Sequence, residues 1–269
     1  MMNVLQRIAL CYGAVVTIHL LVEKVYMQIG IVAACEVIYL GFMYGLDVPK
    51  CGRGKTTEYC NAGAYIDRKI FGDHCYMWEY TEPEGLLSTF SAVSTIYLGY
   101  LFGKIMEKLK GDKDKLGIIW FLLGGVLAGV MGMFSHVIPF NKKIWSFSFG
   151  IFSGAAAGLV LNMIFITEDI MLPGSKIVEF VNKPFVWYGM NPLAIYVGNY
   201  FLNIILRDWI TWNDRENNVL AWLYKNLFDS WMTPLITEYG SSFMFAFFQV
   251  CVWMVVARFL HKYKVFIKL

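Results

Sequence analysis

Charged residues are scarce in this sequence. Asp, Glu, Lys and Arg make up 16% of its 269 residues, whereas soluble domains carry roughly 25%. No block of Lys and Arg that could follow a phosphate backbone occurs, so we expect no nucleic-acid partner. No cleavable signal peptide is evident either, because the first apolar run lacks a small-residue cleavage site and further apolar runs follow it. We therefore expect a chain that inserts through its own spans, or one that begins inside a longer protein.

Seven long apolar runs fill most of the chain instead. Their approximate bounds are 5–22, 25–45, 85–106, 116–136, 145–167, 184–206 and 239–261. Each is long enough to cross a hydrocarbon core of about 30 Å as a helix. Since no backbone group can stay unpaired in lipid, these runs must be helical. The sequence predicts an all-α polytopic membrane protein with about seven transmembrane helices, forming one domain over 1–269, with the lipid bilayer as its first partner.

The positions of Lys and Arg predict an orientation. Positive residues concentrate in the 104–115 connection and in the tail after the seventh span, and such short segments usually face the cytoplasm. We therefore expect a cytoplasmic C-terminus, with the 46–84 loop and the 207–238 segment outside or in a lumen. The 207–238 segment is amphipathic and rich in Trp, so we expect it to lie on the membrane surface.

Three cysteines share the 46–84 loop, namely Cys51, Cys60 and Cys75. They are disulfide candidates, because disulfides persist in non-cytoplasmic compartments. Since the count is odd, at least one of them stays free or pairs outside the loop. None of the asparagines lies in an N-x-[ST] sequon, so glycosylation lends no support to a lumenal location.

The 46–84 loop is also the most informative polar segment. It is too long for a simple connection, and long ordered loops are often functional. Its charged groups of both signs and its aromatic residues suit a polar ligand such as a sugar or a phosphate. A disulfide-stapled cap with surface ion pairs would have the same composition, so both interpretations stay open.

Several ionisable residues are candidates for chemistry. His74 in the loop and His136 at the end of the fourth span could act as general bases, because histidine titrates near the working pH. His19 and His261, at span ends, are more typical of packed or interfacial side chains. Glu36 lies inside the second span, where an ionised carboxylate is expensive. It is either a functional group or a hydrogen-bonded carboxyl that faces another helix.

Two further segments carry polar groups beside spans. Residues 189–192 (GMNP) break the sixth span, so that Asn191 either lines a cavity or follows a simple kink. Lys142 and Lys143 run against the positive-inside trend, which favours an anionic ligand near 138–148. In that segment Trp145 is either part of such a site or an ordinary interfacial aromatic.

Taken in order, several motifs resemble the C-terminal part of the heparan-α-glucosaminide N-acetyltransferase family. They are LQRIALCY (5–12), LDVPKCGRG (46–54), YIDRKIFGDH (65–74), EPEGLLST (82–89), IPFNKKIWSFSF (138–149), GMNPLAIYVG (189–198) and KYKVFIKL (262–269). Together they run from one end of the chain to the other. The combination is specific, although each motif alone is weak.

The resemblance implies a multi-pass transferase of the lysosomal membrane. It would move an acetyl group from cytosolic acetyl-CoA, a co-substrate, to the terminal glucosamine of heparan sulfate on the lumenal side. The implied partners are acetyl-CoA, a glycosaminoglycan amino sugar and, as a further candidate, a second copy of the chain; no metal is expected. Acetyl-CoA needs cationic contacts for its phosphates, and an amine needs a base before it attacks.

Candidate site residues follow from charge, the predicted side of the membrane and motif match. The catalytic candidates are His74, Asp67 and Glu84, of which the two carboxylates would orient the sugar hydroxyls or amine. The cationic candidates for holding phosphate or sulfate are Arg53, Arg68 and Lys142. The remaining candidate binding residues are Arg7, Asp47, Asn141, Trp145, Ser146 and Asn191.

The sequence departs from the family pattern in two places. The family's presumed active-site histidine lies in an early span, in a motif resembling H-x-x-WNGLTVADLVFP, and nothing similar occurs here. Some relatives also carry a histidine after the GMN motif, where this chain has Asn199. We therefore expect that the family's first spans and lumenal domain are missing. An inactive truncated paralogue or a small-molecule transporter are the alternatives, although a transporter should show paired broken helices and we find one broken span.

Overall fold

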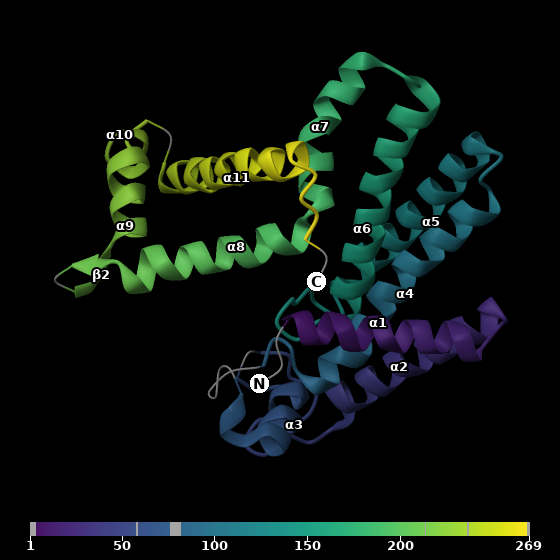
Figure 1. Ribbon diagram of the computed structural model, residues 1–269. Helices are drawn as coiled ribbons and strands as arrows, with labels where there is room; N and C mark the ends of the chain where they lie inside the picture. Colours follow the sequence, from purple (N-terminus) through teal and green to yellow (C-terminus); the bar gives the residue numbers. More distant parts are fainter. Residues whose placement is uncertain (1–3, 58, 76–81, 213, 236, 268–269) are drawn as a thin grey trace. The chain divides into compact units, whose positions relative to one another are not determined.

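The computed structural model describes residues 4–57, 59–75, 82–212, 214–235 and 237–267. The chain divides into two compact units, Met1–Pro173 and Gly174–Leu269, and each is described by itself (Figure 1). The sequence predicts a single domain over 1–269, and the joint action of the two units as one domain stays a prediction.

The first unit is built around one central helix. Its elements are α1 (Val4–Leu21), α2 (Val25–Gly45), α3 (Ala62–Phe71), the 3₁₀ turn η1 (Gly72–His74), α4 (Leu86–Lys108), α5 (Lys113–Phe134), α6 (Phe147–Phe165) and the π-helical turn η2 (Ile166–Met171). Helix α4 packs against α1, α2, α3, α5 and α6. Its apolar window is 50% buried, whereas no other candidate span exceeds 28%.

Small residues allow the close packing of α4 and α6. A Cβ atom on Gly158 would overlap the ring of Phe102, and one on Gly154 would come within 2.9 Å of Leu98. The same helices enclose an apolar core with α5 that includes Trp120 and Ala155. Without side chains on those glycines, the two backbones approach closely enough to bury this core.

The second unit contains shorter elements. They are α7 (Lys176–Met190), α8 (Pro192–Ile204), the π-helical turn η3 (Ile205–Trp209), the antiparallel strands β1 (Thr211–Trp212) and β2 (Asp214–Asn218), α9 (Val219–Tyr224), the π-helical turn η4 (Lys225–Asp229), α10 (Ser230–Met232) and α11 (Glu238–Lys262). Helix α11 packs against α7 and η4. The 207–238 segment is therefore a succession of short elements, and its place on a membrane surface stays a prediction.

Six helices in the described ranges are long and apolar enough to cross a membrane, namely α1, α2, α4, α5, α6 continued by η2, and α11. They match six of the seven predicted spans, which confirms the prediction of an all-α polytopic membrane protein. The remaining predicted span, the sixth (184–206), is interrupted at Asn191, and Pro192 begins the next helix. Proline suits that first position because its missing N–H would have no helical partner there.

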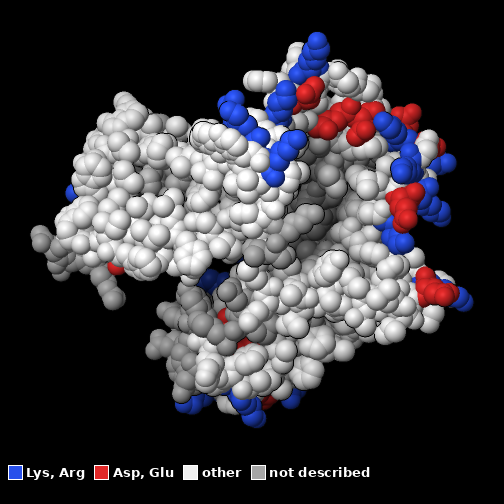
Figure 2. All heavy atoms as spheres, in the orientation of Figure 1, with Lys and Arg blue, Asp and Glu red and all other residues white. Residues whose placement is uncertain are grey.

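Side chains on the helix surfaces agree with a lipid environment. On α5, Phe121, Leu122 and Val126 are each at least 57% exposed, which would be costly in water. Charged side chains gather in patches, and much of the visible surface between them is free of charge (Figure 2). Which patch faces the cytoplasm stays a prediction.

The 46–84 loop contains a disulfide between Cys51 and Cys60, with Cα atoms 5.5 Å apart. This confirms the prediction of a disulfide-bearing loop and selects one pair from its three cysteines. The thiol of Cys75 is buried and free, and burial raises its pKa. Residues 58 and 76–81 of the loop lie outside the described part.

A candidate site around Arg7

Arg7, on the first turn of α1, ties three segments of the first unit together. The side chain is only 5% exposed. Its Nη1 donates to the carbonyl oxygen of Pro83 at 2.7 Å, and its Nη2 donates to that of Ser88 at 3.1 Å. The guanidinium carbon also lies 4.3 Å from the centroid of the Trp145 ring, a distance typical of a cation–π contact. Arg7 thus joins α1 to the start of α4 and to the turn before α6.

Asp67, on α3, lies at the N-terminus of α4. It is 2% exposed, and its Oδ1 accepts a hydrogen bond from the backbone N–H of Leu86 at 2.8 Å. Carboxylates are favourable there because the first N–H groups of a helix have no partner within it. Gly85 makes room for this contact, since a Cβ atom on it would overlap the carboxyl group of Asp67.

Burial raises the pKa of Asp67 from 3.8 to about 6, although the hydrogen bond from Leu86 opposes this shift. Asp67 and Glu84 both interact electrostatically with Arg7. The carboxyl group of Asp67 therefore exchanges a proton near neutral pH, beside a permanent positive charge. We call Arg7, Asp67, Glu84 and Trp145 the Arg7 cluster.

The turn before α6 holds Trp145 in place. Asn141 and Ser146 bond to each other twice: the N–H of Asn141 donates to Ser146 Oγ, and the N–H of Ser146 donates to the Asn141 carbonyl, both at 3.0 Å. Between them Trp145 has a φ of 47°, a strained value for a bulky residue. Its Nε1 donates to Thr95 Oγ1 of α4 at 3.2 Å. The indole ring is thereby fixed where Arg7 contacts it.

Apart from the buried Ser146, the other predicted site residues of the first unit lie at or near its surface. Asn141 donates through Nδ2 to the Thr56 carbonyl at 3.3 Å and so links the turn before α6 to the 46–84 loop. His74 is exposed, with Nδ1 3.2 Å from the Phe71 carbonyl oxygen. Arg68 is half-exposed, whereas the exposed candidates are Asp47, Arg53 and Lys142. Four of the predicted site residues thus lie together in the Arg7 cluster, and the others lie outside it. The functional role of every one of them stays a prediction.

Asn191, in the second unit, is fully buried at the break between α7 and α8. Its Nδ2 donates to the Val265 carbonyl at 3.0 Å, and its Oδ1 accepts from the N–H of Ile267 at 2.8 Å. Both ends of the amide therefore hold the C-terminal segment. Its contact with a substrate stays a prediction.

The predicted set omits a line of polar side chains along α4. Ser91 and Ser94 both donate to Oε1 of Glu36 in α2, so Glu36 is the hydrogen-bonded carboxyl facing another helix. One turn further, Tyr97 donates to Gln28 Oε1 at 3.1 Å. We call Ser88, Ser91, Ser94, Tyr97 and Tyr100 the α4 polar stripe. Their spacing of three residues within an apolar run was the sequence signal for one buried face.

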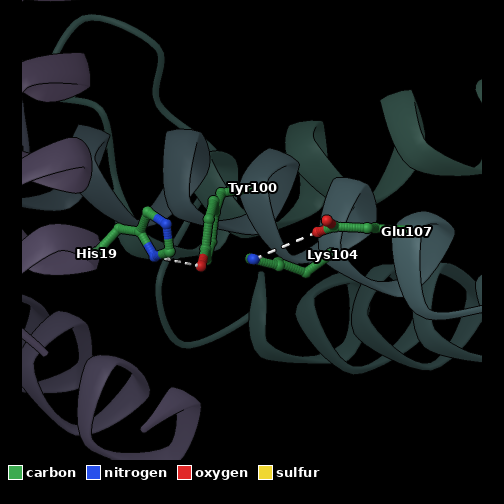
Figure 3. Close-up of polar contacts among 4 residues, drawn as sticks. All are labelled: His19, Tyr100, Lys104 and Glu107. Carbon is green, nitrogen blue, oxygen red and sulfur yellow. Dashed lines mark hydrogen bonds and ion pairs between the residues drawn. The ribbon is translucent and has the colours of Figure 1, made fainter. Parts of the chain in front are cut away.

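The stripe ends where α1 and α4 meet, as Figure 3 shows. The hydroxyl group of Tyr100 lies 2.9 Å from Nδ1 of His19, and the two rings are 5.2 Å apart. On the next turn Lys104 pairs with Glu107 at 3.3 Å. The side chains of His19 and Glu107 at this end are exposed, whereas Arg7 and Asp67 near the other end of α4 are buried.

The fold defines a polytopic membrane protein in which Arg7 and Asp67 are buried charged residues of the first unit, and comparison with known proteins narrows the class. No family model matches the chain. The chain is similar to heparan-alpha-glucosaminide N-acetyltransferase from Homo sapiens, with 27% identity over 253 residues, or 74% of this chain and 37% of that protein. The Mus musculus protein of the same name is 30% identical over 201 residues, or 62% of this chain and 30% of that protein.

The chain thus spans about a third of the length of these curated relatives. The similarity supports distant homology with N-acetyltransferases of this kind, in agreement with the motifs quoted from the sequence. It does not assign individual residues.

Proposed function

We propose that this chain contributes to a transmembrane N-acetyltransferase that moves an acetyl group from acetyl-CoA to a terminal glucosamine of heparan sulfate. The similarity to two proteins named for this activity carries the proposal. The Arg7 cluster is its site within this chain. A lysosomal membrane and a cytoplasmic C-terminus belong to the same proposal, which the positions of Lys and Arg favour.

Arg7 would hold an anionic group of a substrate. Its two Nη atoms are already bonded to the chain, but its Nε has no hydrogen-bond partner among the described residues. A guanidinium stays charged at all relevant pH values and offers planar donors that match phosphate or carboxylate oxygens. Trp145 limits its movement from one side.

Asp67 would accept the proton of the substrate's ammonium group, because its pKa of about 6 suits a base near neutral pH. The freed amine would then attack the thioester carbonyl carbon. A carbon–nitrogen bond forms, the carbon–sulfur bond breaks, and the second amine proton leaves with the thiol of coenzyme A. Glu84, the more exposed of the two carboxylates, would orient the amino sugar.

Three cations at or near the surface would attract the sulfated glycan. Arg53, Arg68 and Lys142 lie in the 46–84 loop and in the turn before α6. Because such surface charges act through solvent, their contribution should weaken as salt is added. His74, the third catalytic candidate, would act from the surface.

The test is transfer of labelled acetyl from acetyl-CoA to glucosamine in membranes that contain this chain. The chain is assayed alone and together with the N-terminal portion of the human relative. Arg7→Ala should abolish the transfer, whereas Arg207→Ala, at a side chain 72% exposed, should leave it unchanged. Absence of transfer in both preparations would refute the proposal.

An inactive relative is the alternative that one observation favours. The three histidines of the first unit, His19, His74 and His136, are all exposed, and none belongs to the buried Arg7 cluster. In that case acetyl-CoA would still bind without transfer, and the assay above would detect binding of label but no product.

A further inference from the structure

A cavity of about 450 Å³ lies between α2, α4, α5 and α6. This volume falls within the range of roughly 300–1,000 Å³ that is usual for sites of small organic ligands. Its lining consists of apolar side chains, such as Val32, Leu98 and Leu123, together with three polar ones, Glu36, Ser94 and Tyr97. It shares no residue with the Arg7 cluster.

Glu36 is the polar group of this lining that lacks a partner. Ser94 donates to Glu36, and Tyr97 donates to Gln28, so both hydroxyl groups are already engaged. Glu36 is 6% exposed; its Oε1 accepts two hydrogen bonds, but its Oε2 has no hydrogen-bond partner within the described ranges. Among the residues that the structure describes, no Lys or Arg lines the cavity.

These features select the chemistry of the occupant. A carboxylate in an apolar medium is costly unless an opposite charge and hydrogen bonds compensate it. An alkyl carboxylate would be repelled by an ionised Glu36, and an alcohol would supply no charge that favours the ionised form. An ammonium group would supply both the donors and the charge that Oε2 lacks.

We propose that the cavity binds a long-chain amine. The hydrocarbon chain fills the space between α2, α4, α5 and α6, and the carboxyl group of Glu36, whose Oε2 is buried, turns to accept a hydrogen bond from the ammonium group. The occupant is thus a single-chain cationic amphiphile, distinct in place and chemistry from the substrates of the acetyl transfer.

The proposal is tested with three probes of one chain length, namely dodecylamine, dodecanol and dodecanoate. Binding to the purified full chain is measured by native mass spectrometry and by the shift in thermal unfolding. We expect one amine per chain, bound about tenfold or more tightly than the alcohol, because hydrogen bonds to charged groups discriminate by that much. Equal binding of all three probes, or no amine binding, would overturn the proposal.

Two variants locate the site. Glu36→Gln should abolish the preference for the amine while the chain still binds alcohol and amine equally. Leu123→Trp narrows the cavity from α5 without changing Glu36 and should abolish binding of both. The matched control is Glu107→Gln, at a carboxylate 72% exposed and paired with Lys104, which should retain the preference. A preference for the amine that persists in Glu36→Gln would contradict the proposed contact.

Discussion

The guanidinium group of Arg7 lies over the indole ring of Trp145, 4.3 Å from its centroid. The two residues belong to segments that are far apart in the sequence, at the first turn of α1 and the turn before α6. Because Arg7 also bonds to the carbonyls of Pro83 and Ser88, one side chain joins the start of α1 to two other segments of the first unit. Its loss should therefore affect folding as well as any binding.

Arg7→Ala should lower the free energy of unfolding by about 2–4 kcal/mol, because it removes the hydrogen bonds to the carbonyls of Pro83 and Ser88 and the contact with Trp145. Denaturant titration of the purified chain would measure the change. The matched variant Arg207→Ala should stay within about 0.5 kcal/mol of the wild type, since surface pairs contribute little. An unchanged unfolding curve for Arg7→Ala would contradict the observed contacts.

Asp67 should make stability depend on pH. Its pKa is raised from 3.8 to about 6 in the folded chain, so the folded state binds a proton more tightly than the unfolded state does. The resulting stabilisation is present below about pH 4 and is lost as the pH rises through about 6. The unfolding midpoint is measured between pH 4 and pH 6 for the wild type and for Asp67→Asn. The two midpoints should diverge across this range, and an equal pH dependence in both proteins would refute the raised pKa of Asp67.

Acetyl transfer, where it occurs, should rise with pH through the same region. A base must be deprotonated to act, so the rate should increase around an apparent pKa of about 6. Asp67→Asn should abolish this step, whereas His74→Gln should leave the profile unchanged if Asp67 is the base. A profile that persists in Asp67→Asn and disappears in His74→Gln would reverse the assignment.

Removing the Cys51–Cys60 disulfide should cost about 2–3 kcal/mol, as expected for a bond that closes a loop with a sequence separation of 9. Cys51→Ser, Cys60→Ser and the double variant should lose the same amount, because each breaks the same bond. Thermal unfolding with and without reductant measures this loss. A double variant much less stable than either single one would show that the cysteines act separately.

Two glycines of neighbouring helices provide a matched pair. Gly158→Ala should destabilise the chain by about 1–3 kcal/mol, because the new methyl group would overlap the Phe102 ring. Gly129→Ala, where nothing lies within 4 Å, should be neutral or slightly stabilising. Thermal unfolding of both variants gives the comparison, and equal effects would mean that α4 and α6 do not approach as described.

The sequence was sufficient for the helices that depend on local composition. Six apolar runs became membrane-length helices because an apolar run in lipid has no other way to pair its backbone. The break at Asn191 was equally readable, since Pro192 cannot extend the hydrogen bonding of α7. A disulfide in the 46–84 loop could be predicted from the three cysteines of that loop. That Cys51 pairs with Cys60 and not with Cys75 required the structure.

Contacts between distant segments could not be read from local patterns. A motif match selected Arg7 as a site residue, but its carbonyl partners, Pro83 and Ser88, are set by how α1 meets α4. Asp67 was expected to contact substrate, whereas its Oδ1 bonds to the first turn of α4. Ser91 and Ser94, which bond to Glu36, were recognisable in the sequence as polar residues three apart in an apolar run. That the helix facing them would be α2 could not be read from the sequence.

The α4 polar stripe also bears on how the chain enters the bilayer during synthesis. With a mean hydropathy of 1.3, α4 is the least apolar of the six candidate spans. If it were inserted alone, Ser91, Tyr97 and Tyr100 would lack the side-chain partners that they have on α1 and α2. Gln28, Glu36 and Arg7 satisfy it only from α1 and α2, which are synthesised earlier. Helix α4 should therefore leave the insertion machinery together with the first hairpin rather than as an independent segment.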